Sequence, residues 1–304
     1  AITGFVLWKI CLWLHFPLSF ADCLIFGALI SPTDPIAVAS VFQNTKNVPE
    51  RIKAKITGES LLNDAAGILL LVILVRFFYT NDIGHITPRL IISIIVQEAI
   101  GGVLWGLFIG YITAFFLSKT NDTEISILFT LAMVSGGYIL ADKLHASGAI
   151  AMVVAGLIVG NLSKTQRFSA TTTLSLNKFW DLVDGILNAF LFVLIGLEML
   201  TIDVHYSILL FGIIGIGIVF IARFASMLLP SILLVDRKKY PFRWAELVLL
   251  CWGGIRGAIS VALALSIPQF PGSLVAITYC VVIFSILIQG STFKWLVNKV
   301  YPGT

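Results

Sequence analysis

Three acidic residues, Asp34, Glu59 and Asp64, lie in stretches of sequence that are otherwise mostly apolar. Asp34 stands between two prolines, in the run Ser31-Pro32-Thr33-Asp34-Pro35. Because each proline lacks a backbone donor and clashes with the preceding turn, a helix cannot run unbroken through this segment. A break in an apolar environment is tolerated only where protein or a water-filled cavity satisfies the freed backbone groups. We therefore expect a functional break at Asp34, with a simple proline kink as the alternative.

The second and third acids belong to the run Gly58-Glu59-Ser60-Leu61-Leu62-Asn63-Asp64, which Gly67 follows closely. The spacing of Ser60, Asn63, Asp64 and Gly67 places them on one face of a helix. Carboxylate, amide and hydroxyl oxygens suit a hard cation, and no nearby His or Cys suggests a transition metal. Gly67 would allow close approach of the broken helix. A polar clamp between helices through Asn63 and Ser60 is the alternative.

A second interruption occurs late in the chain, at Trp252-Gly253-Gly254-Ile255-Arg256-Gly257. Paired broken helices in corresponding halves of a chain indicate a transporter's binding site near the middle of the membrane. We expect the two breaks to cross. Arg256 would then face the negative ends of the half-helices, and Asp34 the positive ends. The alternative is that the glycines only permit tight packing while Arg256 reaches outward.

The deeply placed charges do not cancel. Asp34, Glu59 and Asp64 stand against Arg223 and Arg256, which leaves one negative charge over. In a medium of low dielectric constant, an unpaired carboxylate either takes up a proton or holds a cation. Because only one of the two can be bound at a time, this arrangement meets the stoichiometric requirement of an antiporter.

The elements that position these residues are membrane spans. The 304 residues are 58% hydrophobic and only 12% charged, with a mean hydropathy of +0.99, and apolar stretches of about 20 residues recur along the chain, each long enough to cross a bilayer as a helix. The sequence therefore predicts an all-α polytopic membrane protein. The expected spans are residues 1–16, 20–41, 56–78, 90–117, 125–141, 147–160, 180–197, 208–234, 245–265 and 274–293.

Every second predicted loop is rich in Lys and Arg, with Arg51, Lys164 and Lys239 as examples. The intervening loops hold only Arg89 and Lys143. Cytoplasmic loops carry such an excess, so we expect a cytoplasmic C-terminus. The net charge of +4 is then a topology signal, and nucleic-acid binding is not expected. Because the sequence begins at Ala1 inside an apolar stretch, we expect a clipped first span and further spans upstream.

Three motifs of this chain, taken together, resemble those of sodium/proton antiporters of the NhaP and NHE type. They are Ser-Pro-Thr-Asp-Pro, Gly-Glu-Ser-Leu-Leu-Asn-Asp and Gly-Gly-Ile-Arg-Gly-Ala. The resemblance extends over essentially the whole chain. It implies an inverted-repeat fold with two broken, crossing helices, and an elevator-like alternating access between a core domain and a dimerisation domain. It also implies a homodimer. Residues 1–304 are then one membrane transporter domain without a soluble domain.

The resemblance also implies roles for individual residues. Asp64 would be the carboxylate shared by the cation and the proton, Ser60 and Thr33 would supply further oxygens, and Asp34 would be the acid of the first crossing. Asn63, directly before Asp64, would mark electroneutral 1:1 exchange.

For the basic residues, the resemblance implies that Arg223 pairs with Glu59, which leaves Arg256 at the second crossing. The expected activity is exchange of Na⁺, or of Li⁺ or K⁺, for H⁺ across a bacterial plasma membrane. The ions are substrates, and no cofactor is expected. An enzyme is not expected, because no nucleophile–base set appears in the sequence. A cation channel or a transport-like sensor using the same polar site is the alternative, although nothing resembles a carbonyl-lined filter.

Overall fold

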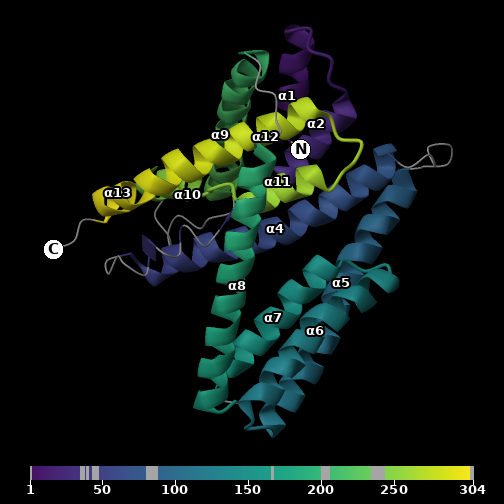
Figure 1. The fold of residues 1–304 in the computed structure, drawn as a ribbon, viewed down its shortest axis with the longest axis vertical. Helices are drawn as coiled ribbons and strands as arrows, with labels where there is room; N and C mark the ends of the chain where they lie inside the picture. The colour runs from purple at the N-terminus through teal and green to yellow at the C-terminus, as the bar shows by residue number, and fades with distance from the viewer. Residues whose placement is uncertain are drawn as a thin grey trace. The chain divides into compact units, whose positions relative to one another are not determined.

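The computed structural model describes residues 2–34, 38, 41–42, 48–79, 88–165, 168–199, 206–233 and 244–301. In these ranges the regular elements are all helical (Figure 1). They are α1 (Ile2–Trp13), α2 (Phe20–Leu29), α4 (Glu50–Tyr79), α5 (Pro88–Lys119), α6 (Thr123–Lys143), α7 (Gly148–Lys164), α8 (Ala170–Met199), α9 (Tyr206–Leu233), α10 (Trp244–Trp252), α11 (Ala258–Leu265), α12 (Gly272–Phe284), a π-helical turn (Ser285–Gly290) and α13 (Ser291–Val300).

The helices agree with the predicted spans. Among the described residues, 6 helices are long and apolar enough to cross a membrane, and each contains or closely matches one of the predicted spans. The all-α polytopic fold is thus confirmed. Several helices extend beyond the predicted ends, and α8 begins at Ala170 rather than near residue 180. Hydropathy identifies the apolar part of a helix and does not detect polar turns at its ends, so the predicted bounds are shorter than the helix.

Both predicted breaks are present. The helix α2 ends at Leu29, and residues 31–34 have no regular structure. The helix α10 ends at Trp252, and α11 begins only at Ala258. Pro35, which contributed to the predicted first break, lies outside the described residues, as do the loop residues Lys46, Arg167 and Lys239.

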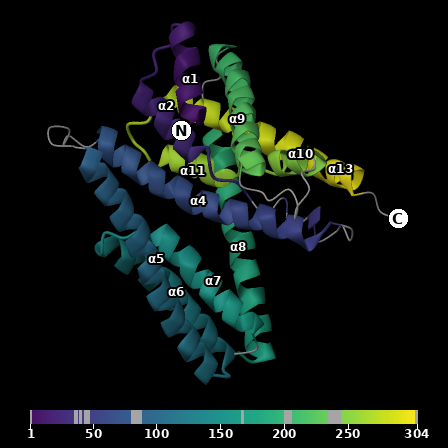
Figure 2. The same cartoon turned by 180° about the vertical axis from the view of Figure 1, so that it is seen from behind.

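The chain divides into two compact units, residues 1–67 with 191–304 and residues 68–190. The first unit contains both breaks. In it, α1 packs on α2 and α9, and α12 packs on α9 and α11 (Figures 1 and 2). The crossing of α1 and α2 is close, since a Cβ added to Gly27 would lie 2.8 Å from the backbone N of Gly4.

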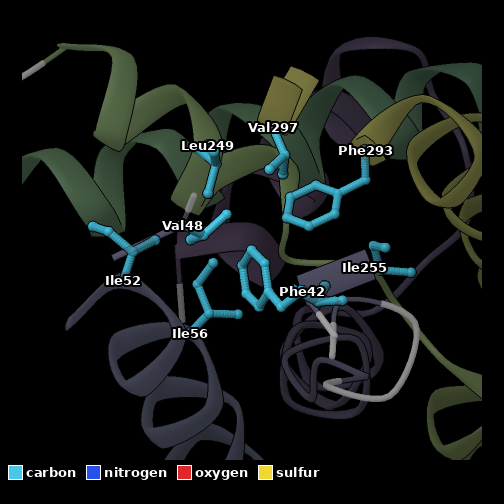
Figure 3. Packing of buried hydrophobic residues seen from close by; sticks show 9 residues of the cluster. Phe42, Val48, Ile52, Ile56, Leu249, Ile255, Phe293 and Val297 are labelled. Carbon is cyan, nitrogen blue, oxygen red and sulfur yellow. The ribbon is translucent and has the colours of Figure 1, made fainter. Parts of the chain in front are cut away.

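A buried apolar cluster in the first unit joins helices that flank the second break. Ile52 and Ile56 of α4 meet Leu249 of α10 and Ile255 of the break, and α13 contributes Phe293 and Val297 (Figure 3). The rings of Phe42 and Phe293 lie edge to face, with their centroids 5.7 Å apart. This packing anchors the irregular segment next to Arg256 on regular helices.

The second unit is built on α5, α6 and α7, which lie side by side (Figures 1 and 2). Gly102, Gly106 and Gly110 recur every four residues along α5, where a side chain would collide with the backbone or side chains of α7. Small residues of this kind let helices approach closely where a membrane offers no hydrophobic driving force between them. An ion pair between Arg76 and Glu98, with Nη1 and Oε1 3.1 Å apart, joins α4 to α5 within this unit.

Replacing Gly106 with alanine should destabilise the second unit. The new Cβ would lie 2.8 Å from Cβ of Val154 and even closer to the carbonyl oxygen of Ala151. We expect overpacking of about 1–3 kcal/mol, seen as a lower melting temperature of the purified full-length protein in detergent. Gly156→Ala, where the added Cβ would contact nothing within 4 Å, is the matched control and should melt at or above the wild-type temperature. Equal melting temperatures for both variants would contradict the proposed packing.

Candidate ion-binding site

The first break packs on the polar face of α4. The backbone N–H of Thr33 donates to Oδ1 of Asp64 at 2.9 Å, and Oγ1 of Thr33 donates to Oγ of Ser60 at 3.0 Å. Thr33 and Ser60 are only 2% and 1% exposed. Because Pro32 ends the regular helix, the N–H of Thr33 is free of an intrahelical partner and can reach Asp64. Three of the predicted site residues thus meet at one place.

Asn63 holds the same break one residue earlier. Its Nδ2 donates to the carbonyl oxygen of Ser31 at 2.5 Å, and its Oδ1 accepts from Oγ of Ser31 at 2.8 Å. The amide of Asn63 is therefore occupied by Ser31, in the clamp between helices that was one alternative from the sequence. Gly67 also lies against the break, since a Cβ there would be 3.0 Å from Cδ of Pro32.

The two breaks cross through their backbones. The N–H of Asp34 donates to the carbonyl oxygen of Ile255 at 2.7 Å. Nη1 of Arg256 donates to the carbonyl oxygens of Ser31 and of Pro32, the latter at 3.2 Å. Arg256 is 7% exposed, so it points into the protein and does not reach outward.

At the crossing, the charged side chains of Arg256 and Asp34 each lie near the end of a half-helix. Arg256 contacts carbonyls directly after the C-terminus of α2, where the helix dipole is negative. Asp34 lies against Gly257, the residue before α11, and a Cβ on Gly257 would be 2.8 Å from Cβ of Asp34. The N-terminus of a helix favours such a negative charge. Residue 257 must therefore be glycine for the two breaks to approach this closely.

Glu59 and Arg223 form an ion pair between α4 and α9. Nη1 and Nη2 of Arg223 donate to the two carboxylate oxygens of Glu59 at 2.7 and 2.8 Å. Nη2 also donates to the carbonyl oxygen of Leu250, near the end of α10, at 3.0 Å. The side chain of Arg223 is 6% exposed and that of Glu59 is 24% exposed. Such bidentate pairs are the strong ones, because both charges are satisfied in a fixed geometry.

Asp64 differs from Glu59 in this respect. In the part of the chain that the structure describes, its carboxylate accepts one hydrogen bond, from Thr33, and forms no ion pair. Nearby, a cavity of about 370 Å³ is lined by residues of both breaks and of the ion pair, including Ser31, Glu59, Asn63, Arg223 and Arg256. Asn63, the residue before Asp64, lines this space. A half-buried carboxylate without an ion pair can accept a small cation or a proton.

The structure brings together all the residues that the sequence singled out. The functional roles of these residues are predictions. Sequence reasoning quoted Ser31 in the motif of the first break without giving it a role, and it missed Ser285 and Gln289. Ser285 and Gln289 are four residues apart in an apolar span, which places them on one helix face, and this spacing was the available signal.

Replacing Glu59 with glutamine should strongly destabilise the protein. The substitution removes the negative partner of a buried arginine, and breaking a buried pair in this way costs about 3–5 kcal/mol. We expect a clear fall in the melting temperature of the full-length protein in detergent.

Glu50→Gln is the matched control, because it breaks an exposed pair with Lys53 on the same helix, in which the Glu50 side chain is 86% exposed. Exposed pairs contribute little to stability, so this variant should melt as the wild type does. A Glu59→Gln variant that melts at the same temperature as Glu50→Gln would show that the pair with Arg223 is not important for stability.

Known proteins resemble this chain along most of its length. The family model described as "Sodium/hydrogen exchanger, transmembrane" matches residues 1–299. The Na(+)/H(+) antiporter NhaP of Pseudomonas aeruginosa is 39% identical over 289 residues, which cover 93% of this chain and 67% of that protein. The Na(+)/H(+) antiporter NhaH of Halobacillus dabanensis is 34% identical, and the alignment covers 93% of this chain and 69% of that protein.

A solved structure, that of the sodium proton antiporter MjNhaP1 from Methanocaldococcus jannaschii at pH 8, has a similar fold. The TM-score is 0.76 at 20% sequence identity, and the match covers 99% of this chain and 75% of that one. The broken helices expected from the resemblance thus belong to a known antiporter fold. Members of the matched family are transporters and not enzymes. With its fold, its crossing breaks and its family match in agreement, this chain belongs to the transmembrane sodium/hydrogen exchanger family.

Proposed function

We propose that the protein exchanges Na⁺ for H⁺ across a membrane by alternating access, with Asp64 as the carboxylate that both ions share. The observation that carries the proposal is the contrast between two acids on α4. Glu59 is neutralised by Arg223, whereas Asp64 receives only the Thr33 N–H among the described residues. An acid that forms no ion pair in the described part of the chain has a charge available for exchange.

The oxygens around Asp64 suit a monovalent cation. Thr33, whose N–H donates to the carboxylate, also holds its hydroxyl against that of Ser60, and hard cations prefer such oxygen ligands. Asp34 would contribute its charge at the crossing, while Asn63 fixes the backbone of the first break. Li⁺ and K⁺ are further candidate substrates of the same chemistry. The ions are substrates in this proposal, and no cofactor takes part.

We infer that the two compact units have different roles in transport. The first unit holds both breaks, Asp64 and the Glu59–Arg223 pair, and we infer that it is the transporting core. The second unit, with α5, α6 and α7, would then belong to the dimerisation domain of a homodimer, both within one transporter domain. The proposed location is a bacterial plasma membrane, with the C-terminus on the cytoplasmic side.

Asp64→Asn should abolish exchange while the protein still folds. A neutral amide cannot hold the exchanged charge, and its burial costs less than that of a carboxylate. Sodium-driven pH change in proteoliposomes of the full-length protein is the measurement, and Glu124→Gln, which removes an exposed acid on α6, is the control that should retain wild-type rates. Residual sodium-driven flux in well-folded Asp64→Asn would remove Asp64 from the mechanism.

Exchange should be electroneutral and should show competition between the two ions. If one carboxylate alternates between H⁺ and Na⁺, each cycle moves one positive charge in each direction, so the membrane potential neither drives nor opposes it. Protons should raise the apparent KM for sodium at acidic pH, because protonated Asp64 cannot bind the cation. At alkaline pH proton reloading becomes limiting, so the rate should pass through a maximum.

Initial rates over a grid of pH and sodium concentration, with and without a valinomycin-clamped potential, test both statements. A rate that follows the imposed potential, or a sodium KM that is constant across the acidic range, would exclude a single shared carboxylate. It would indicate a second titrating group, such as Asp34 or Glu98.

A further inference from the structure

A π-helical turn, Ser285–Gly290, interrupts the last long helix between α12 and α13. Two of its polar side chains are buried, Ser285 at 1% and Gln289 at 3% exposed. Thr292 follows on α13, so the three residues form a polar stripe along one side of an otherwise apolar span. Single π-helical turns of this kind often occur at functional sites. Neither Ser285 nor Gln289 contacts Asp64 in any described interaction, so their burial needs a different explanation.

These side chains bind the backbone of the second break at both of its ends. Nε2 of Gln289 donates to the carbonyl oxygen of Trp252 at 3.0 Å, and Oγ of Ser285 accepts from the N–H of Arg256 at 2.7 Å. Oγ of Ser285 in turn donates to Oε1 of Gln289. The four groups form one continuous chain of hydrogen bonds from residue 252 to residue 256.

Thr292 extends the chain to a side chain of α10. Its Oγ1 accepts from Nε1 of Trp252 at 2.9 Å. The last residue of α10 is therefore held through both its carbonyl and its indole, and the first charged residue after it through its N–H. We call the hydrogen bonds of Ser285, Gln289 and Thr292 to Trp252 and Arg256 the bracket.

The bracket determines where Arg256 lies. With its backbone fixed by Ser285, the guanidinium of Arg256 reaches the carbonyl oxygens of Ser31 and Pro32 in the first break. The next residue, Thr33, donates its N–H to Asp64. A sequence of direct contacts thus leads from Gln289 and Ser285, through Arg256 and the first break, to the carboxylate.

We propose that Ser285 and Gln289 are positioning residues for cation binding, which act on Asp64 through Arg256 and the first break. The inference rests on the proposed function, because the property it concerns is the affinity of the Asp64 site for sodium. Residues that orient the direct ligands of an ion without touching it commonly contribute 10- to 100-fold to affinity. Loosening the bracket should weaken sodium binding and leave the number of sites unchanged.

Ser285→Ala and Gln289→Met test the proposal in the full-length protein. Alanine removes only the hydroxyl, and methionine keeps the length of glutamine without its hydrogen bonds. In proteoliposomes each variant should raise the sodium KM about tenfold, with a maximal rate within about twofold of the wild type. Because a partly unfolded preparation lowers the maximal rate and not the KM, this split separates positioning from misfolding.

Two further features distinguish the bracket from general packing. The double variant should have the KM of the more affected single variant, because both substitutions break the same chain of hydrogen bonds. The increase should persist at alkaline pH, where protons no longer compete, because it reflects affinity for the cation. Thr278→Val is the matched control, since Thr278 is a buried residue of α12 whose hydroxyl, among the described residues, donates within its own helix, to the carbonyl oxygen of Leu274 at 2.8 Å. Its sodium KM should be that of the wild type.

Sodium binding to purified protein in detergent, measured with radioactive ²²Na⁺, supplies a second readout that does not need transport. Dissociation constants raised about tenfold in both single variants, with Thr278→Val unchanged, support the proposal. Values within twofold of the wild type in both, or an equal rise in Thr278→Val, overturn it while leaving the proposed exchange intact. A wild type that binds sodium without exchanging it contradicts the proposed function alone, and one that does neither contradicts both.

Discussion

The structure of the first unit depends on one constraint, the need to satisfy backbone polar groups where two helices are broken inside an apolar layer. Each unsatisfied N–H or C=O there costs several kcal/mol, because no water replaces the lost hydrogen bond. The two breaks solve this problem for each other. Asp34 donates its N–H to Ile255, and Arg256 supplies donors to the carbonyls of Ser31 and Pro32.

The same constraint separates the charges that hold the structure together from the charge that we propose is exchanged. The guanidinium of Arg223 donates to Glu59 and to the carbonyl oxygen of Leu250, and the guanidinium of Arg256 donates to backbone carbonyls. Neither guanidinium donates to Asp64 in a described contact. Asp64 instead accepts from the backbone N–H of Thr33, which the break leaves without an intrahelical partner. The polar residues that hold the breaks and the acid proposed to bind ions are different residues within one network.

The second unit uses a different means of association. Its helices approach through glycines and alanines, with Gly106 against Ala151, because apolar side chains gain little from meeting one another instead of lipid. Among the described residues, it also holds an ion pair between Arg76 and Glu98. The first unit, by contrast, contains the crossing backbones and the proposed ion site.

The sequence by itself determined the helical class, the approximate spans, the positions of both breaks and the face of α4 that carries Ser60, Asn63 and Asp64. These features follow from local properties, namely hydropathy, proline and glycine chemistry, and helical periodicity. Only the tertiary structure decided which groups pair. The sequence predicted that Arg256 faces a negative helix end, but not that its partners are the carbonyls of Ser31 and Pro32. That choice, like the contact of Asn63 with Ser31 and those of Ser285 and Gln289 with the second break, depends on which of many polar groups meet across distant segments. No local pattern encodes that choice, because it is set by the packing of the whole unit.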